Sequence, residues 1–320
     1  MIPVNTNFPD QIAAALMATF PDAGSIESVT VLREGFRNIV LETSGGDVFK
    51  IAKNWEASAT YAMEQRVLPE LGESLAAPIP YPLWYAGKSP RFPFGVLGYP
   101  KLAGTSLRPE VPLSKELNTL ARDIARFMFS LHRVPVTDSL KQHLPRPDTY
   151  WYQLAKVPDA ILPTLRELLS DAQYATVKRW WNDFLEDDRV RRFTPVVVHG
   201  DLSYDNILVS GDRSTVTGVV DFENLALGDP AQDFATQLHL GRDVAESVLE
   251  HYQAAGGILD TDVRYRMQKR WELRGFNGMQ LAIHFEDQAA FDTALANLLN
   301  GPILNPTTRK DTTIWQPPRN

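Results

Sequence analysis

The stretch VVVHGDLSYDNILV, residues 196–209, constrains the fold more than any other part of the chain. Two aliphatic runs, each typical of a strand, flank a polar turn that carries Asp201 and Asn206 five positions apart. A further run, TGVVDFEN at 217–224, reaches Asp221, 15 residues beyond Asn206. Turns on a rigid support are where functional side chains usually lie, so we expect these three oxygen-bearing groups to face one cleft. The alternative is that they only form or cap turns.

The length and composition describe an ordinary globular protein. At 320 residues the chain is longer than one hydrophobic core usually supports, so two lobes are expected. It has no cysteine, which excludes disulfides and thiol catalysis, and no run of about 18 apolar residues that could span a membrane. The start of the chain lacks the features of a secretory signal. We therefore expect a cytoplasmic protein, and a monomer or a weak dimer.

The charge pattern bears on the partners. A formal net charge of −7 argues against nucleic-acid binding, because phosphate contacts need clustered Lys and Arg, and it favours a cationic small molecule. The densest basic stretch lies in a helix-like segment, which we interpret as a solvated helix face, with an anion site as the alternative. Its members are Arg264, Arg266, Lys269, Arg270 and Arg274.

Hydrophobic patterning divides the chain into two parts. The first hundred residues predict a small antiparallel sheet with a helix inserted after its third strand, since short alternating runs are joined by a Gly-rich turn. The strands are expected at 25–35, 38–47, 48–53 and 92–102, and the helices at 8–20 and 55–74. The later part predicts helices at 113–134, 160–193 and 230–300. The tail after 300 has no periodicity and is expected to pack as an extended arm or to be mobile.

The motifs are similar to those of protein kinases. HGDLSYDN has Asp201 and Asn206 at the spacing of the kinase catalytic loop, H-R-D-L-x-x-x-N, and DFEN puts Asp221 where kinases have the aspartate of D-F-G. With Glu223 in place of the glycine and GDPAQDFA after it, the chain closely resembles the aminoglycoside phosphotransferase family.

This resemblance, which covers residues 25 to 300, implies a bilobal, protein-kinase-like α+β fold. We expect an N-lobe at 1–102, with a small antiparallel sheet, one helix and the nucleotide site. A larger, mainly helical C-lobe at 103–320 would carry the catalytic loop and the helices that bind the acceptor.

The resemblance also implies roles for the motif residues. In phosphoryl transfer the charge lies on the phosphoryl oxygens, so an enzyme mainly positions groups and supplies cations. Asn206 and Asp221 offer the oxygen ligands that Mg²⁺ prefers, and Asp201 would accept or orient the proton of the acceptor hydroxyl. Glu223 would lie in the outer shell of the metal. Three further residues are expected to be structural: His199, Asp229 and Asp233.

In the N-lobe, the resemblance assigns a lysine and a glutamate. Lys50, in VFKIAK, matches the phosphate-binding lysine, with Lys53 on the opposite face of the strand as its rival. Glu64 matches the helix glutamate that pairs with this lysine, with Glu56 and Glu70 as rivals.

The nucleotide loop and the hinge complete the expected site. LREGFRNIV resembles the family's short nucleotide loop, with Gly35 at the turn and Asn38 starting the next strand, but Phe36 and Arg37 replace the small residues expected there. GVLGYPKLAGTSL resembles the hinge that binds adenine. It puts Tyr99 at the gatekeeper position, with the carbonyl of Pro100 and the N–H of Leu102 as partners of the base. The aliphatic residues expected to line the base pocket are Ile51, Ile207, Leu208 and Val220.

These residues predict a kinase that moves the γ-phosphate of ATP or GTP, with Mg²⁺, to a hydroxyl of a small molecule. The resemblance suggests an aminoglycoside as the acceptor, but a macrolide, choline, homoserine or a sugar are alternatives. A second alternative is that the protein is a catalytically silent, kinase-like binding protein. Candidate acceptor-binding groups are the aromatic cluster Tyr150, Trp151 and Tyr152, and the acids Asp183, Glu186, Asp187, Asp188, Glu286 and Asp287.

Overall fold

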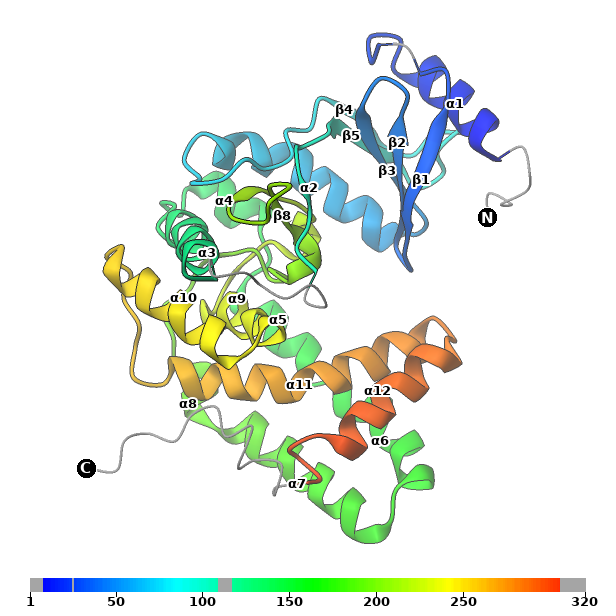
Figure 1. Ribbon diagram of the computed structural model, residues 1–320. Coiled ribbons are helices and arrows are strands. Elements are labelled where there is room, and N and C mark those ends of the chain that lie inside the picture. The colour runs from blue at the N-terminus through cyan, green and yellow to red at the C-terminus, as the bar shows by residue number, and fades with distance from the viewer. Residues whose placement is uncertain (1–7, 25, 109–116, 306–320) are drawn as a thin grey trace.

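The computed structural model describes residues 8–24, 26–108 and 117–305, and it has two lobes (Figure 1). The upper lobe in that view contains a sheet with two helices, and the lower lobe is mainly helical. The predicted bilobal α+β architecture is therefore confirmed. The tail after 305 and the first residues of the helix predicted at 113–134 lie outside the described residues.

The sheet of the N-lobe is antiparallel, with its five strands in the order β1-β2-β3-β5-β4. Gly46, with φ 84°, closes the predicted hairpin between the second and third strands. The edge strand β4 was missed, because its Pro-rich surroundings read as irregular. The bounds are β1 Val29–Glu34, β2 Asn38–Thr43, β3 Asp47–Ala52, β4 Trp84–Ala86 and β5 Val96–Pro100.

The alternation of side chains along β3 separates the core of the N-lobe from the cleft. Phe49 and Ile51 pack in one hydrophobic cluster with Leu16 of α1 (Phe8–Thr19). Val48 and Lys50 lie on the opposite face, which is turned to the C-lobe. The helix α2 (Trp55–Gly72) follows, and the side chain of Asn54 caps its first turn.

Short strand pairs hold the polar motifs of the C-lobe. Strand β7 (Val196–Val198) pairs with β10 (Ala226–Gly228), while β8 (Ile207–Val209) lies between β6 (Thr105–Ser106) and β9 (Val216–Val219). The turn with Asp201 and Asn206 connects β7 to β8, and Asp221 follows β9 closely. The predicted strand pair around these motifs therefore forms, and it brings both turns to the same edge.

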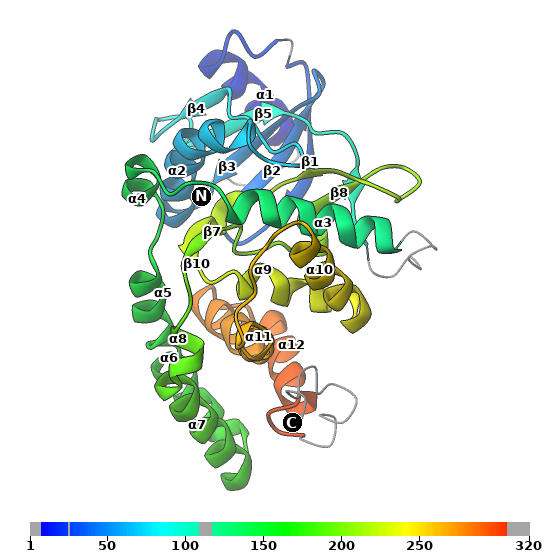
Figure 2. The same cartoon turned by 90° about the vertical axis from the view of Figure 1, so that its left-hand side faces the viewer.

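Helices surround these strands. Figure 2 shows α3 crossing below the sheet, with α9 and α10 beneath it, and α5, α6 and α7 descending along one side. The helices are α3 Leu117–His132, α4 Asp138–His143, α5 Pro147–Leu154, α6 Val157–Leu168, α7 Asp171–Glu186, α8 Asp188–Arg191, α9 Ala231–Thr236, α10 Arg242–Ala254, α11 Val263–His284 and α12 Gln288–Asn300. Single 3₁₀ turns are η1 Tyr204–Asn206, η2 Phe222–Asn224 and η3 Gln237–Leu240. None of the helices in the described ranges has the length and apolar character that a membrane crossing needs.

The basic stretch of α11 is only partly a solvated face. Arg266 is 1% exposed and donates to Asp229 and Asp260, and Arg270 also donates to Asp229. Residues 266 and 270 are one helical turn apart and share the inward side of the helix. The predicted solvated face was wrong for these two arginines, because the charge of Asp229 compensates their burial.

Candidate active site

A cleft of about 440 Å³ lies between the lobes, within the size range of small-molecule sites. The sheet contributes Asn38, Val40, Val48, Lys50 and Tyr99 to its lining. The C-lobe contributes Asp205, Asn206, Leu208, Val220 and Asp221. Residues that are far apart in the sequence, Lys50, Asn206 and Asp221, therefore meet in one crevice.

Lys50 is the centre of a buried cluster of charges. Its ammonium group lies 3.0 Å from Glu64, 2.9 Å from Glu223 and 3.5 Å from Asp221. Burial alone would lower the pKa of Lys50, but the three carboxylates outweigh it and raise this pKa well above its usual value. Burial raises the pKa of Glu64 to about 7, although Lys50 opposes the shift. The lysine is thus held charged and pointed into the cleft.

The carboxylate of Asp221 has an unsatisfied oxygen. The residue adopts a left-handed conformation, φ 67° and ψ 67°, which is uncommon outside glycine. Its Oδ1 is buried and, among the described residues, accepts no hydrogen bond, while Lys50 lies 3.5 Å away. Leaving a buried oxygen unpaired costs about 1–3 kcal/mol, so a strained backbone presents an acceptor that still lacks a ligand.

Asn206 and Asp201 are joined on the loop itself. The Nδ2 group of Asn206 donates to the carbonyl of Asp201 at 2.8 Å and to its Oδ2 at 3.3 Å. The amide oxygen of Asn206 is then the atom left to ligate a cation. Burial, with the nearby charge of Asp221, raises the pKa of Asp201 to about 6.

These groups fit a magnesium ion. The Asp221 oxygen, which accepts no hydrogen bond from the described residues, and the amide oxygen of Asn206 are hard donors, and Mg²⁺ is usually bound by few protein ligands together with substrate phosphates. Within the described residues no group of three or more His, Asp or Glu side chains could form a complete metal site. In this cleft, the oxygens that could hold such an ion are those of Asn206 and Asp221.

Asp233 braces the loop that carries Asp201. Its Oδ2 accepts the N–H of His199 at 3.0 Å, and its Oδ1 accepts the N–H of Gly200 at 2.9 Å. The ring of His132 lies 3.0 Å from the same Oδ2. Gly200 has φ 84°, and a Cβ there would lie 2.2 Å from the carbonyl oxygen of Asn224, so only glycine fits this turn.

We expect Asp233→Ala to lower the free energy of unfolding by about 3 kcal/mol or more, because two loop N–H groups and His132 lose a buried charged acceptor. Urea unfolding at pH 7 measures this change. Burial would raise the pKa of Asp233, but its hydrogen bonds lower it below the usual carboxyl value. In the unmutated protein, Asp233 therefore contributes to the free energy of unfolding above about pH 4, and this contribution is lost as the pH falls through the lowered pKa of Asp233. A variant as stable as the parent at pH 7 would contradict this account.

Of the residues predicted for the nucleotide loop and hinge, only some line the cleft. Asn38 lines it and donates to Glu223, while Gly35 lies at the loop turn, where its carbonyl accepts from Lys53. Tyr99 and Leu102 line the cleft. Pro100 ends β5 with an exposed side chain and is not among the lining residues. Of the predicted aliphatic residues, Leu208 and Val220 line the cleft, whereas Ile51 and Ile207 belong to the two cores.

The two unusual residues of the nucleotide loop reach across to other elements. Phe36 stacks on Phe285, at the end of α11, with 4.9 Å between ring centroids. Arg37 lies 3.6 Å from Glu56, at the start of α2. Phe36 and Arg37, which stand where small residues were expected, thus make contacts with elements outside the loop.

Sequence reasoning did not predict two charged contacts around Lys50 and Asp221. Glu223 contacts Lys50 directly, although only an outer-shell place near the metal was expected for it. Arg33 lines the cleft with its neighbour Leu32, since a bulge in β1 lets consecutive residues face the same side, and it lies 4.0 Å from Asp221. The motif DFEN could have indicated the contact of Glu223, but the position of Arg33 depends on a β-bulge, which the sequence does not reveal.

The candidate acceptor-binding residues are not gathered in one place. Asp187 accepts hydrogen bonds from Arg189 and Tyr265, which lower its pKa, and Asp287 caps α12. The helix α7, with two of the acids, lies at the end of the C-lobe away from the sheet (Figure 1). Tyr150 contacts Arg270, and Tyr152 is 66% exposed, so the three predicted aromatic residues form no box.

Comparison of the sequence with known proteins finds one family and several relatives. A model of the phosphotransferase enzyme family, APH, matches residues 28–269. Viomycin phosphotransferase from Streptomyces vinaceus is 28% identical over 189 residues, which cover 58% of this chain and 61% of that protein. The uncharacterized protein YcbJ from Bacillus subtilis (strain 168) is 33% identical over 119 residues, covering 37% of this chain and 39% of the relative. The matched segment is thus less than two thirds of each relative.

Solved structures share the fold over most of its length. The GDP and kanamycin complex of APH(2")-IIIa superposes with a TM-score of 0.80 at 24% identity, covering 90% of this chain and 96% of that one. Macrolide 2'-phosphotransferase type I gives a TM-score of 0.70 at 22% identity, covering 93% and 99%. At these identities the likeness shows the fold. The family model spans well over half of the sequence, and the chain belongs to the phosphotransferase enzyme family.

Proposed function

We propose that this protein transfers the γ-phosphate of ATP or GTP to a hydroxyl group of a small molecule. The observation that supports this most is the meeting of Lys50, Asn206 and Asp221 in the crevice between the lobes, with Asp201 hydrogen-bonded to Asn206 beside it. We further propose that the lobes divide near residue 102, and that the protein acts in the cytoplasm as a monomer or a weak dimer.

The proposed mechanism assigns one task to each group. Lys50, held by Glu64, binds the phosphates of the nucleotide, and Arg33 adds a second cation above them. Asn206 and Asp221 would hold Mg²⁺, which supplies charge neutralisation of the phosphoryl oxygens. Asp201, with a raised pKa, accepts the proton of the acceptor hydroxyl or orients it.

The base of the nucleotide is proposed to lie against the hinge. The side chain of Tyr99 is the gatekeeper, and the carbonyl of Pro100 and the N–H of Leu102 are the polar partners. Val40, Val48, Leu208 and Val220 supply apolar walls to the same cleft, as stacking of a purine requires. A GDP complex and an ADP complex occur among the similar structures, so both nucleotides belong in the test.

A coupled assay of nucleotide consumption tests this function. The unmutated protein, with ATP and then GTP, is offered kanamycin, viomycin, erythromycin, choline, homoserine and simple sugars, and phosphorylated products are identified by mass spectrometry. We expect nucleotide turnover that depends on one acceptor class and a product heavier by one phosphoryl group. A protein that binds neither nucleotide in the presence of Mg²⁺ would contradict the proposal.

Removal of the metal gives a further prediction. We expect EDTA to abolish turnover and added Mg²⁺ to restore it, because the phosphoryl oxygens lose their main counter-charge. Asp221→Ala should remove the part of the nucleotide affinity that depends on Mg²⁺, as measured by calorimetry with and without the ion. If the unmutated protein binds ATP equally well in both conditions, the assignment of Asp221 is wrong.

A further inference from the structure

A row of aromatic and basic side chains leads from the catalytic loop to the middle of α11. Next to Asp201, the carbonyl of Leu202 accepts hydrogen bonds from Thr236 at 2.7 Å and from Gln237 at 2.6 Å, which fix η3 against the loop. Two residues further, His239 packs edge-on against Tyr204 of the loop, with 5.7 Å between ring centroids. The row therefore begins beside the proposed catalytic aspartate.

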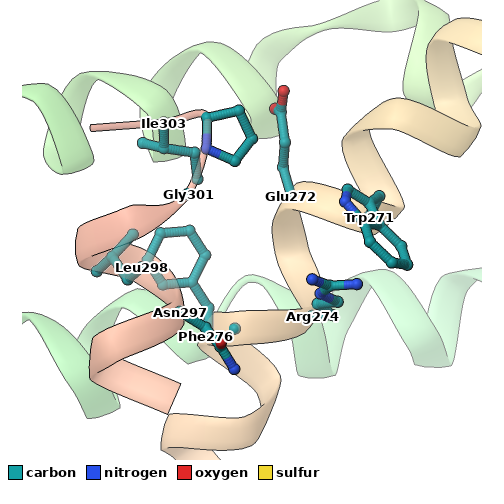
Figure 3. Close-up of a pocket in the computed structure, with 10 residues that line it drawn as sticks. Trp271, Glu272, Arg274, Phe276, Asn297, Leu298, Gly301 and Ile303 are labelled. Atoms are coloured by element: carbon teal, nitrogen blue, oxygen red, sulfur yellow. The ribbon is translucent and has the colours of Figure 1, made fainter. Parts of the chain in front are cut away.

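The row continues on α11 and ends in a guanidinium group. His239 packs against Trp271, with 4.8 Å between ring centroids, and the guanidinium of Arg274 lies 3.3 Å from the centre of the indole. Trp271 is half-buried and packs against the main core of the C-lobe, so the surface on which Arg274 rests is fixed. Figure 3 shows the two side chains together on one side of α11.

Arg274 differs from the other arginines of α11 in having no acidic partner. Arg264 pairs with Glu246, and Arg266 and Arg270 pair with Asp229, but no carboxylate of the described residues lies within 4.0 Å of Arg274. The nearest glutamate in sequence, Glu272, points away from it (Figure 3) and contacts Trp180 and Lys269. The side chain is exposed, so its charge is available to a ligand.

A stacked guanidinium presents the flat donor edge that a carboxylate fits. Its two parallel N–H groups match the two carboxylate oxygens, whereas an ammonium group placed there would be repelled. Two acids, Asp201 and Asp205, belong to the catalytic loop and lie at the end of the row opposite to Arg274. A ligand that lies along the row would therefore meet a carboxylate at one end and a cation at the other.

We propose that Tyr204, His239, Trp271 and Arg274 form the wall of the acceptor site, and that the acceptor carries a carboxylate in addition to the hydroxyl that is phosphorylated. The carboxylate binds Arg274, and a ring or an apolar stem lies along the aromatic faces. This inference rests on the proposed function. It departs from the cationic partner that the net charge favoured, and among the acceptors considered it favours a hydroxy acid, such as homoserine, over choline or an aminoglycoside.

Three matched compounds test the charge without knowledge of the natural acceptor. 4-Hydroxyphenylacetate, tyrosol and tyramine share the same ring and phenol and differ in carrying a carboxylate, an alcohol and an ammonium group. Their binding to the full chain with Mg·ADP is measured by saturation-transfer difference NMR. We expect the acid to bind about tenfold or more tightly than tyramine, with tyrosol between them. Equal binding of the three, tighter binding of tyramine, or no binding of any would overturn the inference.

Variants of Arg274 separate its charge from its packing. Arg274→Lys keeps the charge, Arg274→Met keeps most of the apolar stem on Trp271, and Arg274→Glu reverses the charge. We expect affinity for the acid to fall from the parent to Lys and further to Met, and the preference to reverse in favour of tyramine with Glu. Acid binding that is the same in the parent and in the Met and Glu variants would overturn the inference.

The affinity for Mg·ADP, measured in the same samples, distinguishes the two levels of the account. It should be unchanged in all three variants, since Arg274 lies outside the nucleotide cleft. If the parent does not bind Mg·ADP, the proposed function fails. If Mg·ADP binds and the preference for the acid does not depend on residue 274, the inference about the acceptor fails alone.

Discussion

Replacement of Asp201 by asparagine is expected to lower kcat by about 10³-fold, the loss that is typical when a positioned general base is removed. Asparagine has nearly the same shape, so its side-chain oxygen still accepts from Asn206, as Oδ2 does now at 3.3 Å. What is lost is the charge that receives the proton. The affinity for Mg·ATP should change little, because Lys50 and the proposed metal ligands remain.

A matched control for this variant is Asp212→Asn. Asp212 is also an aspartate in a turn, between β8 and β9, but it is exposed and only accepts hydrogen bonds from Ser210 and Ser214. Turnover of the control should equal that of the parent. Steady-state kinetics on the identified acceptor, with ATP affinity from calorimetry, measures both. Full turnover by Asp201→Asn would refute the role given to Asp201.

Replacement of Lys50 by methionine is expected to affect both stability and activity. Glu64 and Glu223 are buried beside Lys50, and without its charge they have no cation within the described ion pairs. Removing one partner of a buried ion pair lowers the free energy of unfolding by about 3–5 kcal/mol. Protonation of Glu64 in the variant would reduce this loss. The nucleotide also loses its main cation in the N-lobe, so we expect a large rise in KM for ATP.

Lys53→Met is the control on the same segment of chain. Lys53 is partly exposed, lies 3.0 Å from Glu34 and does not line the cleft, so its replacement should change stability by less than about 0.5 kcal/mol. Urea unfolding and ATP kinetics of the two variants are compared side by side. If Lys50→Met is as stable as Lys53→Met and has an unchanged KM for ATP, the cluster around Lys50 does not have the role described.

The sequence could predict which of these two lysines lies in the cleft. Period-two alternation predicted residues 50 and 53 on opposite faces of one strand, and the family pattern selected Lys50. In the structure Lys50 lines the cleft, and Lys53 lies just after the end of β3. In the same way Glu64 was preferred, and its rivals are occupied elsewhere: Glu56 contacts Arg37, and Glu70 accepts from Ser139. Side-chain alternation and a specific motif were sufficient to predict which residue of a single strand or helix faces the cleft.

What could not be predicted depends on contacts between distant segments. The burial of Arg266 requires Asp229, 37 residues earlier, and the place of Arg33 in the cleft requires a bulge against β2. Of the acids proposed for acceptor binding, Asp187 and Asp188 are instead paired with Arg189 and Arg192. The row that ends at Arg274 is assembled from three separate elements, and no single stretch of sequence announces it.

The central claim is that Asn206 and Asp221 hold a metal against a nucleotide whose phosphates lie on Lys50. Its most direct test is a crystal structure with Mn²⁺ and a non-hydrolysable ATP analogue, in which anomalous scattering locates the ion. The account predicts an anomalous peak in direct contact with the amide oxygen of Asn206 and a carboxylate oxygen of Asp221, and a triphosphate beside Lys50. A metal bound elsewhere, or a nucleotide outside this cleft, would contradict it.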